Sequence, residues 1–234
     1  IRNIGSIFLQ NDEDLVAYYK LDNDASDETG NYDGTISGAD CSQSGKIGNA
    51  CLFQENSEHI TIQIPHASEN NVSYSYWVYF NTFPSDYRRV YTPCASGTCN
   101  LVSGSGARGY TQYFKSNNKL RFVKSFYCSA DYASNSNVYS NKNDFQVGEW
   151  YHVVETWNLI NDKSIKIYIN GDLDISGDVT SSCTILEPYR NDFYYFIGKQ
   201  HDTYPQSDLT IDEFMVFNKV LSEDEIKAIY ENTK

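Results

Sequence analysis

The sequence lacks a long hydrophobic run. No stretch of its 234 residues approaches the roughly 20 apolar residues of a membrane-spanning helix, and no basic start with an apolar centre marks a signal peptide. It also lacks excess positive charge, because 31 acidic residues against 18 Lys and Arg give a net charge of −13. Nucleic-acid binding needs positive charge over much of one face. We therefore expect neither membrane insertion nor nucleic-acid binding.

The six cysteines lack the Cys-x-x-Cys spacing of a zinc site, and an even number without that spacing favours disulfides. Sequence alone allows several pairings, and proximity along the chain favours one of them. The predicted pairs are Cys41 with Cys51, Cys94 with Cys99, and Cys128 with Cys183. The alternative is that some are buried free thiols, because Cys packs well as a small apolar residue. Disulfides form in an oxidising compartment, so they predict an extracellular or cell-surface protein.

Alternating apolar and polar residues dominate the chain and predict β-strands. Five such runs are rich in β-branched or aromatic residues and end at Gly, Asn, Asp or Pro: 60–64, 74–80, 150–157, 165–169 and 193–197. Asn170-Gly171 follows one of them directly and is typical of a tight hairpin turn, so we predict a hairpin over 165–175. A chain of this length can form one large all-β domain.

One stretch near the end of the sequence is typical of a helix. Ser222 precedes three acidic residues, which suits an N-cap followed by the positive end of the helix dipole. Ile226, Ile229 and Tyr230 then form an apolar stripe, which predicts a short C-terminal helix. Residues 1–14 show no clear periodicity, so we expect a leader or linker there and a single domain over 15–234.

Segments 15–34 and 209–217 both read as strands that meet acid-rich turns, so we expect the first and last strands to pair. Their acids are then close enough to share a cation. Ca²⁺ takes about six to eight oxygen ligands from carboxylates, amides and backbone carbonyls. The predicted ligands of a structural Ca²⁺ are Asp22, Asp27, Gly30, Asn31 and Asp212. The alternative is that Asp22 and Asp27 only cap turns through backbone amides.

Acidic residues are absent from segment 87–130, which carries seven Lys and Arg interleaved with aromatic residues. Arg binds carboxylate or sulfate with two hydrogen bonds, and aromatic rings cover the apolar face of a sugar. This pattern favours an acidic glycan as ligand. The predicted contacts are Arg88, Arg108, Tyr110, Tyr113 and Tyr127. The alternative is that these cations lie on a solvated face.

Enzyme signatures are scarce. Retaining glycosidases use two carboxylates about 5 Å apart, and no run of suitably spaced acids occurs here. Asp212 and Glu213 are adjacent on the last strand, so we expect them to point to opposite faces. His152 is expected to be a packed strand residue and not a base. We therefore predict that the protein is not an enzyme.

The order of these motifs resembles the laminin-G-like and pentraxin-like jelly rolls of the concanavalin A-like superfamily, over residues 15–233. The motifs occupy 15–22, 27–31, 45–50, 150–157, 167–171, 196–198 and 211–214, with the helix after them. The resemblance implies an all-β, two-sheet antiparallel jelly-roll sandwich with adjacent termini. Related jelly rolls often carry Ca²⁺ between the first turn and the Asp of an Ile-Asp-Glu motif, here Asp212.

That fold is found in lectins, adhesion modules, glycoside hydrolases and polysaccharide lyases, so it does not decide function. We predict a lectin-like module that binds a glycan, in particular an acidic one, without transforming it. The alternative is an adhesion or structural module that binds a surface protein. A polysaccharide lyase or glycoside hydrolase is the third hypothesis.

Overall fold

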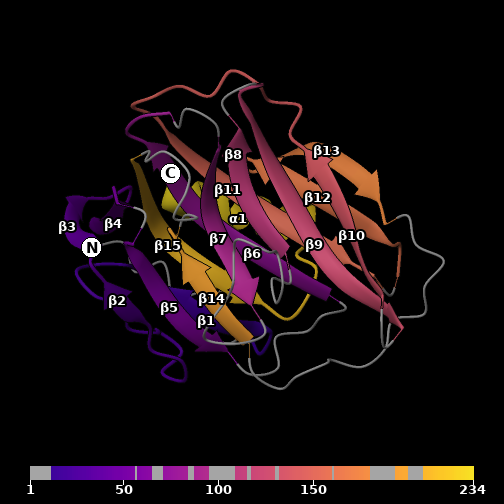
Figure 1. The fold of residues 1–234 in the computed structure, drawn as a ribbon, viewed down its shortest axis with the longest axis horizontal. Coiled ribbons are helices and arrows are strands. Elements are labelled where there is room, and N and C mark those ends of the chain that lie inside the picture. Colours follow the sequence, from indigo (N-terminus) through magenta and orange to yellow (C-terminus); the bar gives the residue numbers. More distant parts are fainter. Residues whose placement is uncertain are drawn as a thin grey trace.

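The fold is a sandwich of two antiparallel β-sheets with one helix (Figure 1). The computed structural model describes residues 12–55, 57–64, 71–83, 87–94, 109–114, 117–129, 132–159, 161–179, 193–199 and 208–234. The two antiparallel sheets confirm the prediction of an all-β jelly-roll sandwich. In the view of Figure 1 one sheet lies in front, the other lies behind it, and the helix lies behind both.

The rear sheet, called sheet A, contains the first and last strands of the described chain. Its strand order is β13-β12-β11-β6-β15-β4-β3, and β1 also pairs with β15. The bounds are β1 Leu15–Tyr19, β3 Asp40–Ser44, β4 Asn49–Phe53, β6 Asn71–Phe80, β11 Trp150–Asn158, β12 Ser164–Ile169, β13 Asp172–Asp178 and β15 Leu209–Phe217.

The front sheet, called sheet B, has the order β10-β9-β8-β7-β14-β5-β2. Its bounds are β2 Thr35–Ser37, β5 His59–Ile64, β7 Tyr87–Cys94, β8 Gly109–Phe114, β9 Lys119–Ser129, β10 Tyr132–Tyr139 and β14 Phe193–Ile197. All five predicted strands lie within these elements. The hairpin prediction is also confirmed, since Asn170 and Gly171 both have positive φ between β12 and β13.

Pairing of the first and last strands is confirmed as well. Strand β1 runs antiparallel to the second half of β15, with Tyr19 opposite Phe214. The first half of β15 pairs instead with β4, and its other edge pairs with β6. A register shift between Asp212 and Met215 separates the two halves. Strand β15 thus connects the two ends of the chain to the middle of sheet A.

The core lies between the two sheets and is rich in aromatic rings. Alternate residues of β6 point inward, where Tyr74 lies 4.8 Å from Tyr91 of sheet B and Tyr76 lies 5.9 Å from the same ring, both between ring centroids. Burial of such rings removes large apolar areas from water, and tilted aromatic pairs add to that stabilisation. The period of two in the sequence therefore marks the residues that hold the two sheets together.

The helix α1, Glu223–Thr233, packs against the outer face of sheet A. Ser222 and Glu225 form a reciprocal capping box at its start, as the N-cap prediction required. Trp77 Nε1 donates to Thr233 Oγ1 over 3.0 Å, and Tyr230 stacks on His152 at 5.8 Å. Within the described residues α1 is the single helix, and none there is long and apolar enough to cross a membrane.

His152 is a packed strand residue, as predicted. Only 1 % of it is exposed, and its Nε2 lies 3.0 Å from Ser75 Oγ. Burial lowers the pKa of His152 to about 3, so the ring is neutral at physiological pH.

Cys41 and Cys51 form a disulfide across β3 and β4, which confirms the first predicted pair. Cys94 is also disulfide-bonded, so its partner is Cys99, Cys128 or Cys183, whose side chains lie outside the described part. The pairs Cys94–Cys99 and Cys128–Cys183 stay predictions. Closing the short Cys41–Cys51 loop constrains the unfolded chain.

We expect Gly198→Ala to destabilise the domain by about 2 to 5 kcal/mol. A Cβ at this position would lie 2.2 Å from the Phe53 ring, and φ is +77°, so the substitution adds a core overlap to the strain of a left-handed backbone. Gly30→Ala is the matched control, because φ is +78° there but no atom lies within 4 Å of the added Cβ. It should cost only about 1 to 2 kcal/mol. Urea unfolding measures both, and equal losses would contradict the packing described.

Candidate functional site

A row of four side chains crosses the outer face of sheet A beside α1. Trp150 of β11 lies opposite Tyr79 of β6, which lies opposite Thr210 of β15, which lies opposite Leu52 of β4. Their chain neighbours point into the core, so strand alternation directs this row outward. The next row, His152, Trp77 and Asp212, lies beneath α1 and the turn between β3 and β4. The four-residue row is therefore the part of this face that stays open.

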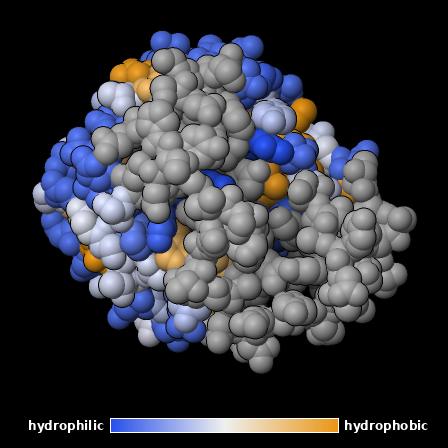
Figure 2. All heavy atoms as spheres, viewed as in Figure 1, coloured by the Kyte–Doolittle hydropathy of each residue, from blue (hydrophilic) through white to orange (hydrophobic). Residues whose placement is uncertain are grey.

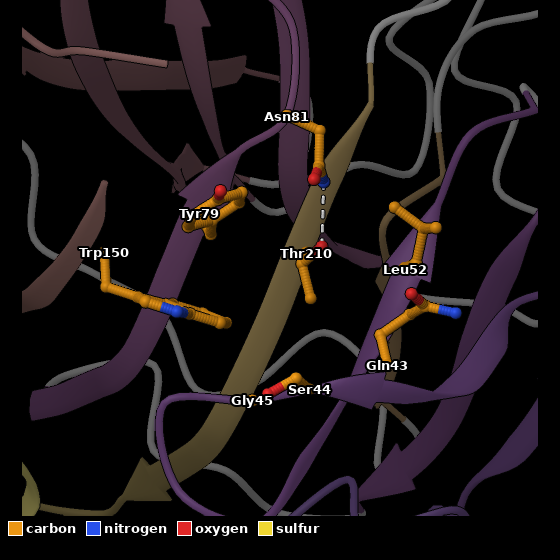
Figure 3. Close-up of a pocket in the computed structure, with 8 residues that line it drawn as sticks. All are labelled: Gln43, Ser44, Gly45, Leu52, Tyr79, Asn81, Trp150 and Thr210. Carbon is orange, nitrogen blue, oxygen red and sulfur yellow. Dashed lines mark hydrogen bonds between the residues drawn. The ribbon is translucent and has the colours of Figure 1, made fainter. Parts of the chain in front are cut away.

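This row forms the floor of a pocket of about 320 Å³ (Figure 3). The β3–β4 hairpin and the end of β6 complete it. The lining residues are Gln43, Ser44, Gly45, Leu52, Tyr79, Asn81, Trp150 and Thr210. The Trp150 and Tyr79 rings are tilted by 50°, with centroids 5.3 Å apart, and both rings are partly exposed. In Figure 3 the Trp150 side chain extends from its own strand toward Thr210.

Polar groups of the pocket are held by internal hydrogen bonds. Asn81 Nδ2 donates to Thr210 Oγ1 over 2.8 Å, and Gln43 Nε2 donates to Asp40 Oδ2 over 2.7 Å. Two aromatic rings beside amides and hydroxyls offer an apolar surface and directed hydrogen bonds together. The volume lies at the small end of the range of about 300 to 1,000 Å³ that is typical of ligand pockets. The pocket is therefore suited to a small polar ligand with one apolar face.

The turn between β3 and β4 forms one wall and is held by two carboxylates from distant parts of the chain. Asp212 Oδ2 accepts from Ile47 N over 3.0 Å, and Asp22 Oδ1 accepts from Asn49 N over 2.6 Å. A Cβ at Gly45 would lie 2.7 Å from Asp212 Oδ2 and closer still to Asn49 O. Only glycine therefore fits at this position, where the turn lies directly against β15.

The expectation that Asp212 and Glu213 point to opposite faces is wrong. Glu213 has φ of +54° within the bulge of β15, which interrupts the alternation of side chains. Asp212 lies opposite Trp77, and Glu213 accepts a hydrogen bond from the Tyr18 hydroxyl, so both lie on the side of α1. Burial raises the pKa of Asp212 to about 8 and that of Glu213 to about 7.

The five predicted calcium ligands fall into two groups. Asp27 accepts hydrogen bonds from the backbone N–H groups of Tyr18, Thr29, Asn31 and Tyr32 and from the Thr29 hydroxyl. It therefore organises its own turn, which contains Gly30 and Asn31. Asp22 and Asp212 instead hold the turn between β3 and β4. Among the described residues no group of three or more His, Cys, Asp or Glu side chains is arranged to hold a metal.

Arg88 and Tyr113 were predicted to contact a ligand, and their burial contradicts this. Arg88 is 0 % exposed and donates from Nη2 to the Gly198 carbonyl over 2.8 Å, and burial lowers its pKa to about 10. Tyr113 is 1 % exposed, donates to Asn118 Oδ1 over 2.7 Å, and has a pKa raised to about 12 by burial. The side chains of Arg108, Tyr110 and Tyr127 lie outside the described part.

The alternative of a solvated basic face is supported only in part, since Arg89 and Lys124 are 7 % and 4 % exposed whereas Lys119 and Arg121 are partly exposed. Sequence reasoning instead missed the pocket, in particular Trp150, Tyr79, Asn81 and Gln43. Strand alternation indicates which face each residue occupies. It does not give the register that aligns four strands, so no signal in the sequence joins these residues.

The architecture defines a lectin-type β-sandwich, and the chain belongs to the concanavalin A-like lectin/glucanases superfamily. A family model of that description, of laminin G type, matches residues 54–227. None of the curated proteins matches the chain significantly.

Solved structures share the fold at low sequence identity. The ligand-binding domain of botulinum neurotoxin serotype D, determined in complex with N-acetylneuraminic acid, has a TM-score of 0.66 at 16 % identity and covers 93 % of this chain. A sialidase from Trypanosoma rangeli has a TM-score of 0.61 at 16 % identity and also covers 93 % of this chain. The chain spans 50 % of the first structure and 32 % of the second. Identities this low show a shared fold alone.

We expect the free energy of unfolding to fall as pH rises from about 5 to 8, in part because of Asp212. Its carboxyl keeps a proton up to a pKa of about 8 when folded, whereas an unfolded Asp releases it near 4, so the unfolded state binds fewer protons in this window. Asp212→Asn cannot titrate and should lose about 3 to 4 kcal/mol less over the same window, because the folded carboxyl holds its proton through most of it.

Urea unfolding at pH 5 and pH 8 in chelator measures this difference. Asp24→Asn, which removes an exposed carboxyl, is the control. An Asp212→Asn variant that keeps the full pH dependence of the parent would show that this carboxyl is already ionised in the folded protein.

Proposed function

We propose that the protein is a carbohydrate-binding module that holds a sugar in the pocket lined by Trp150 and Tyr79. The observation that carries this proposal is the pocket itself, where two partly exposed aromatic rings lie beside amide and hydroxyl groups. A pyranose ring has an apolar face and a rim of hydroxyls, and these two features match the two kinds of surface. Membership of a superfamily that contains lectins supports the same conclusion.

Binding without catalysis is the second part of the proposal. None of the residues that line the pocket is Asp, Glu or His, so it has no carboxylate pair to serve as nucleophile and acid. Asp212 and Glu213 are 0 % and 2 % exposed and are engaged with the turn at Ile47 and with Tyr18. Disulfides at Cys41–Cys51 and at Cys94 support an extracellular or cell-surface location.

Because Arg88 and Tyr113 are buried, the predicted preference for acidic glycans rests on the other three predicted contacts, Arg108, Tyr110 and Tyr127. The neurotoxin domain solved with N-acetylneuraminic acid makes acidic sugars a necessary arm of any binding test. A broad exposed apolar surface would favour the alternative, a protein-binding adhesion module. Among the described residues the large exposed apolar side chains are Tyr139, Val147 and Leu173, and on the face in Figure 2 hydrophobic residues are scattered among hydrophilic ones.

We further propose a structural Ca²⁺ held by Asp22 and Asp212, with backbone carbonyls as the other ligands. Asp212 Oδ1 is buried and accepts no hydrogen bond from the described residues, so this oxygen is available as a metal ligand. Glu213 lies near both carboxylates and adds negative charge. Asp27 does not fit this site, because its oxygens already accept five hydrogen bonds. The ion would fasten the turn between β3 and β4 to β15.

We expect Trp150→Ala to weaken binding of glycans at least tenfold, or about 1.4 kcal/mol, because it removes the stacking surface. A glycan array identifies the ligands, and isothermal titration calorimetry of the best one gives the affinity. Tyr139→Ala is the matched control, since it removes an exposed aromatic ring from β10 of the other sheet.

Equal binding by the parent protein and Trp150→Ala would place the ligand elsewhere, and binding of proteins but no glycans would favour the adhesion module. Unchanged melting temperatures of both variants are the check that folding is intact.

Saturating Ca²⁺ should raise the melting temperature of the parent protein, because a ligand that binds only the native state stabilises it. At a free concentration of about 100 times Kd the gain is about 2.7 kcal/mol. Asp212→Asn should lose this response. Differential scanning calorimetry in Ca²⁺, in Mg²⁺ and in chelator tests the proposal, and identical melting curves for the parent protein in all three would remove it.

A further inference from the structure

We infer that the pocket on sheet A selects neutral sugars and rejects uronates and other acidic sugars. This inference rests on the proposed function, since it assigns a ligand class to the same pocket. It departs from the acidic glycan predicted from segment 87–130 because it is built on different residues.

The fixed direction of Gln43 is the first argument. Its Nε2 donates to the Asp40 carboxylate, which has no proton to give and therefore holds the nitrogen end of the amide. The carbonyl oxygen is left toward the pocket, and in Figure 3 it lies nearer to Thr210 than the nitrogen does. An amide held in this way offers an acceptor to the ligand.

Asn81 offers a second carbonyl oxygen at the other end of the pocket. Its Nδ2 donates to Thr210 Oγ1, so one N–H is engaged and the carbonyl oxygen accepts no hydrogen bond from the described residues. A sugar hydroxyl can donate to both carbonyl oxygens. A carboxylate or sulfate can only accept, so it has no proton for these two oxygens and its donors in the pocket include the Ser44 and Thr210 hydroxyls and the second N–H of each amide.

Charge around the pocket points the same way. None of the lining residues is Lys or Arg, so no cation offsets the loss of hydration when an anion enters. Asp40 lies behind Gln43 and adds a negative charge at the rim. Lys46 follows Gly45 in the chain, but its Nζ lies over the Trp77 ring, 4.6 Å from the centroid. The neighbouring cation is thus turned to a ring outside the pocket lining.

The test compares methyl glycosides of glucose and galactose with the methyl glycosides of glucuronic and galacturonic acid, which differ only at carbon 6. N-acetylneuraminic acid is a further acidic probe. Titration calorimetry at pH 7 is carried out on the parent protein, on Trp150→Ala and on Gln43→Leu, with Tyr139→Ala as the control. We expect each neutral glycoside to bind at least tenfold more tightly than its uronate, and this binding to be lost in Trp150→Ala.

Gln43→Leu should lower the ratio of neutral to uronate affinity to about threefold or less, because it removes the acceptor that opposes the anion. Uronates that bind as well as neutral sugars, with binding still lost in Trp150→Ala, would overturn the inference and leave the proposed function standing. Sugar binding that persists in Trp150→Ala, or no binding of any glycoside, would overturn the proposed function itself and the inference with it.

Discussion

The bulge in β15 is the constraint on which the outer face of sheet A depends. Before the bulge β15 pairs with β4, after it β15 pairs with β1, and along its other edge it pairs with β6. One irregular step therefore joins both ends of the described chain to the middle of the sheet. The same step turns Asp212 and Glu213 to one face, where one holds the β3–β4 turn and the other accepts from Tyr18. Two buried carboxylates side by side oppose ionisation, so burial at this step raises the pKa of both groups.

Coverage of that face then decides where a ligand can bind. The helix α1 covers the row that contains His152 and Trp77, and the β3–β4 turn covers Asp212. The next row, from Trp150 to Leu52, is left open and becomes a pocket between the turn and the end of β6. The wall of the pocket and the buried carboxylate are one structural unit, since Gly45 lies against Asp212. A change at Asp212 is therefore expected to reach the pocket through the position of Gln43 and Ser44.

Much of the fold was predictable, because strand periodicity, Asn170-Gly171 and the Ser222 cap are local signals that act over a few residues. Cys41 and Cys51 were predictable for the same reason. The pocket was not, because it depends on the register of four strands far apart in sequence. The bulge was missed because positive φ at Glu213 has no mark in the residue type. The prediction that Arg88 and Tyr113 contact a ligand failed because both are buried. A cation or a tyrosine in a strand does not indicate which face of the strand points inward. From the sequence, Asp27 could be either a metal ligand or a turn cap. The five hydrogen bonds that it accepts identify it as a turn cap.

The three tryptophans report on whether the open row on sheet A holds the ligand. Trp77 and Trp157 are 2 % and 0 % exposed, whereas Trp150 is partly exposed in the pocket, so the two buried indoles are internal controls. We predict that titration with methyl glucoside or methyl galactoside shifts the indole N–H resonance of Trp150 in a ¹H–¹⁵N spectrum and leaves those of Trp77 and Trp157 in place. Saturable sugar binding with no change in the Trp150 resonance would contradict it.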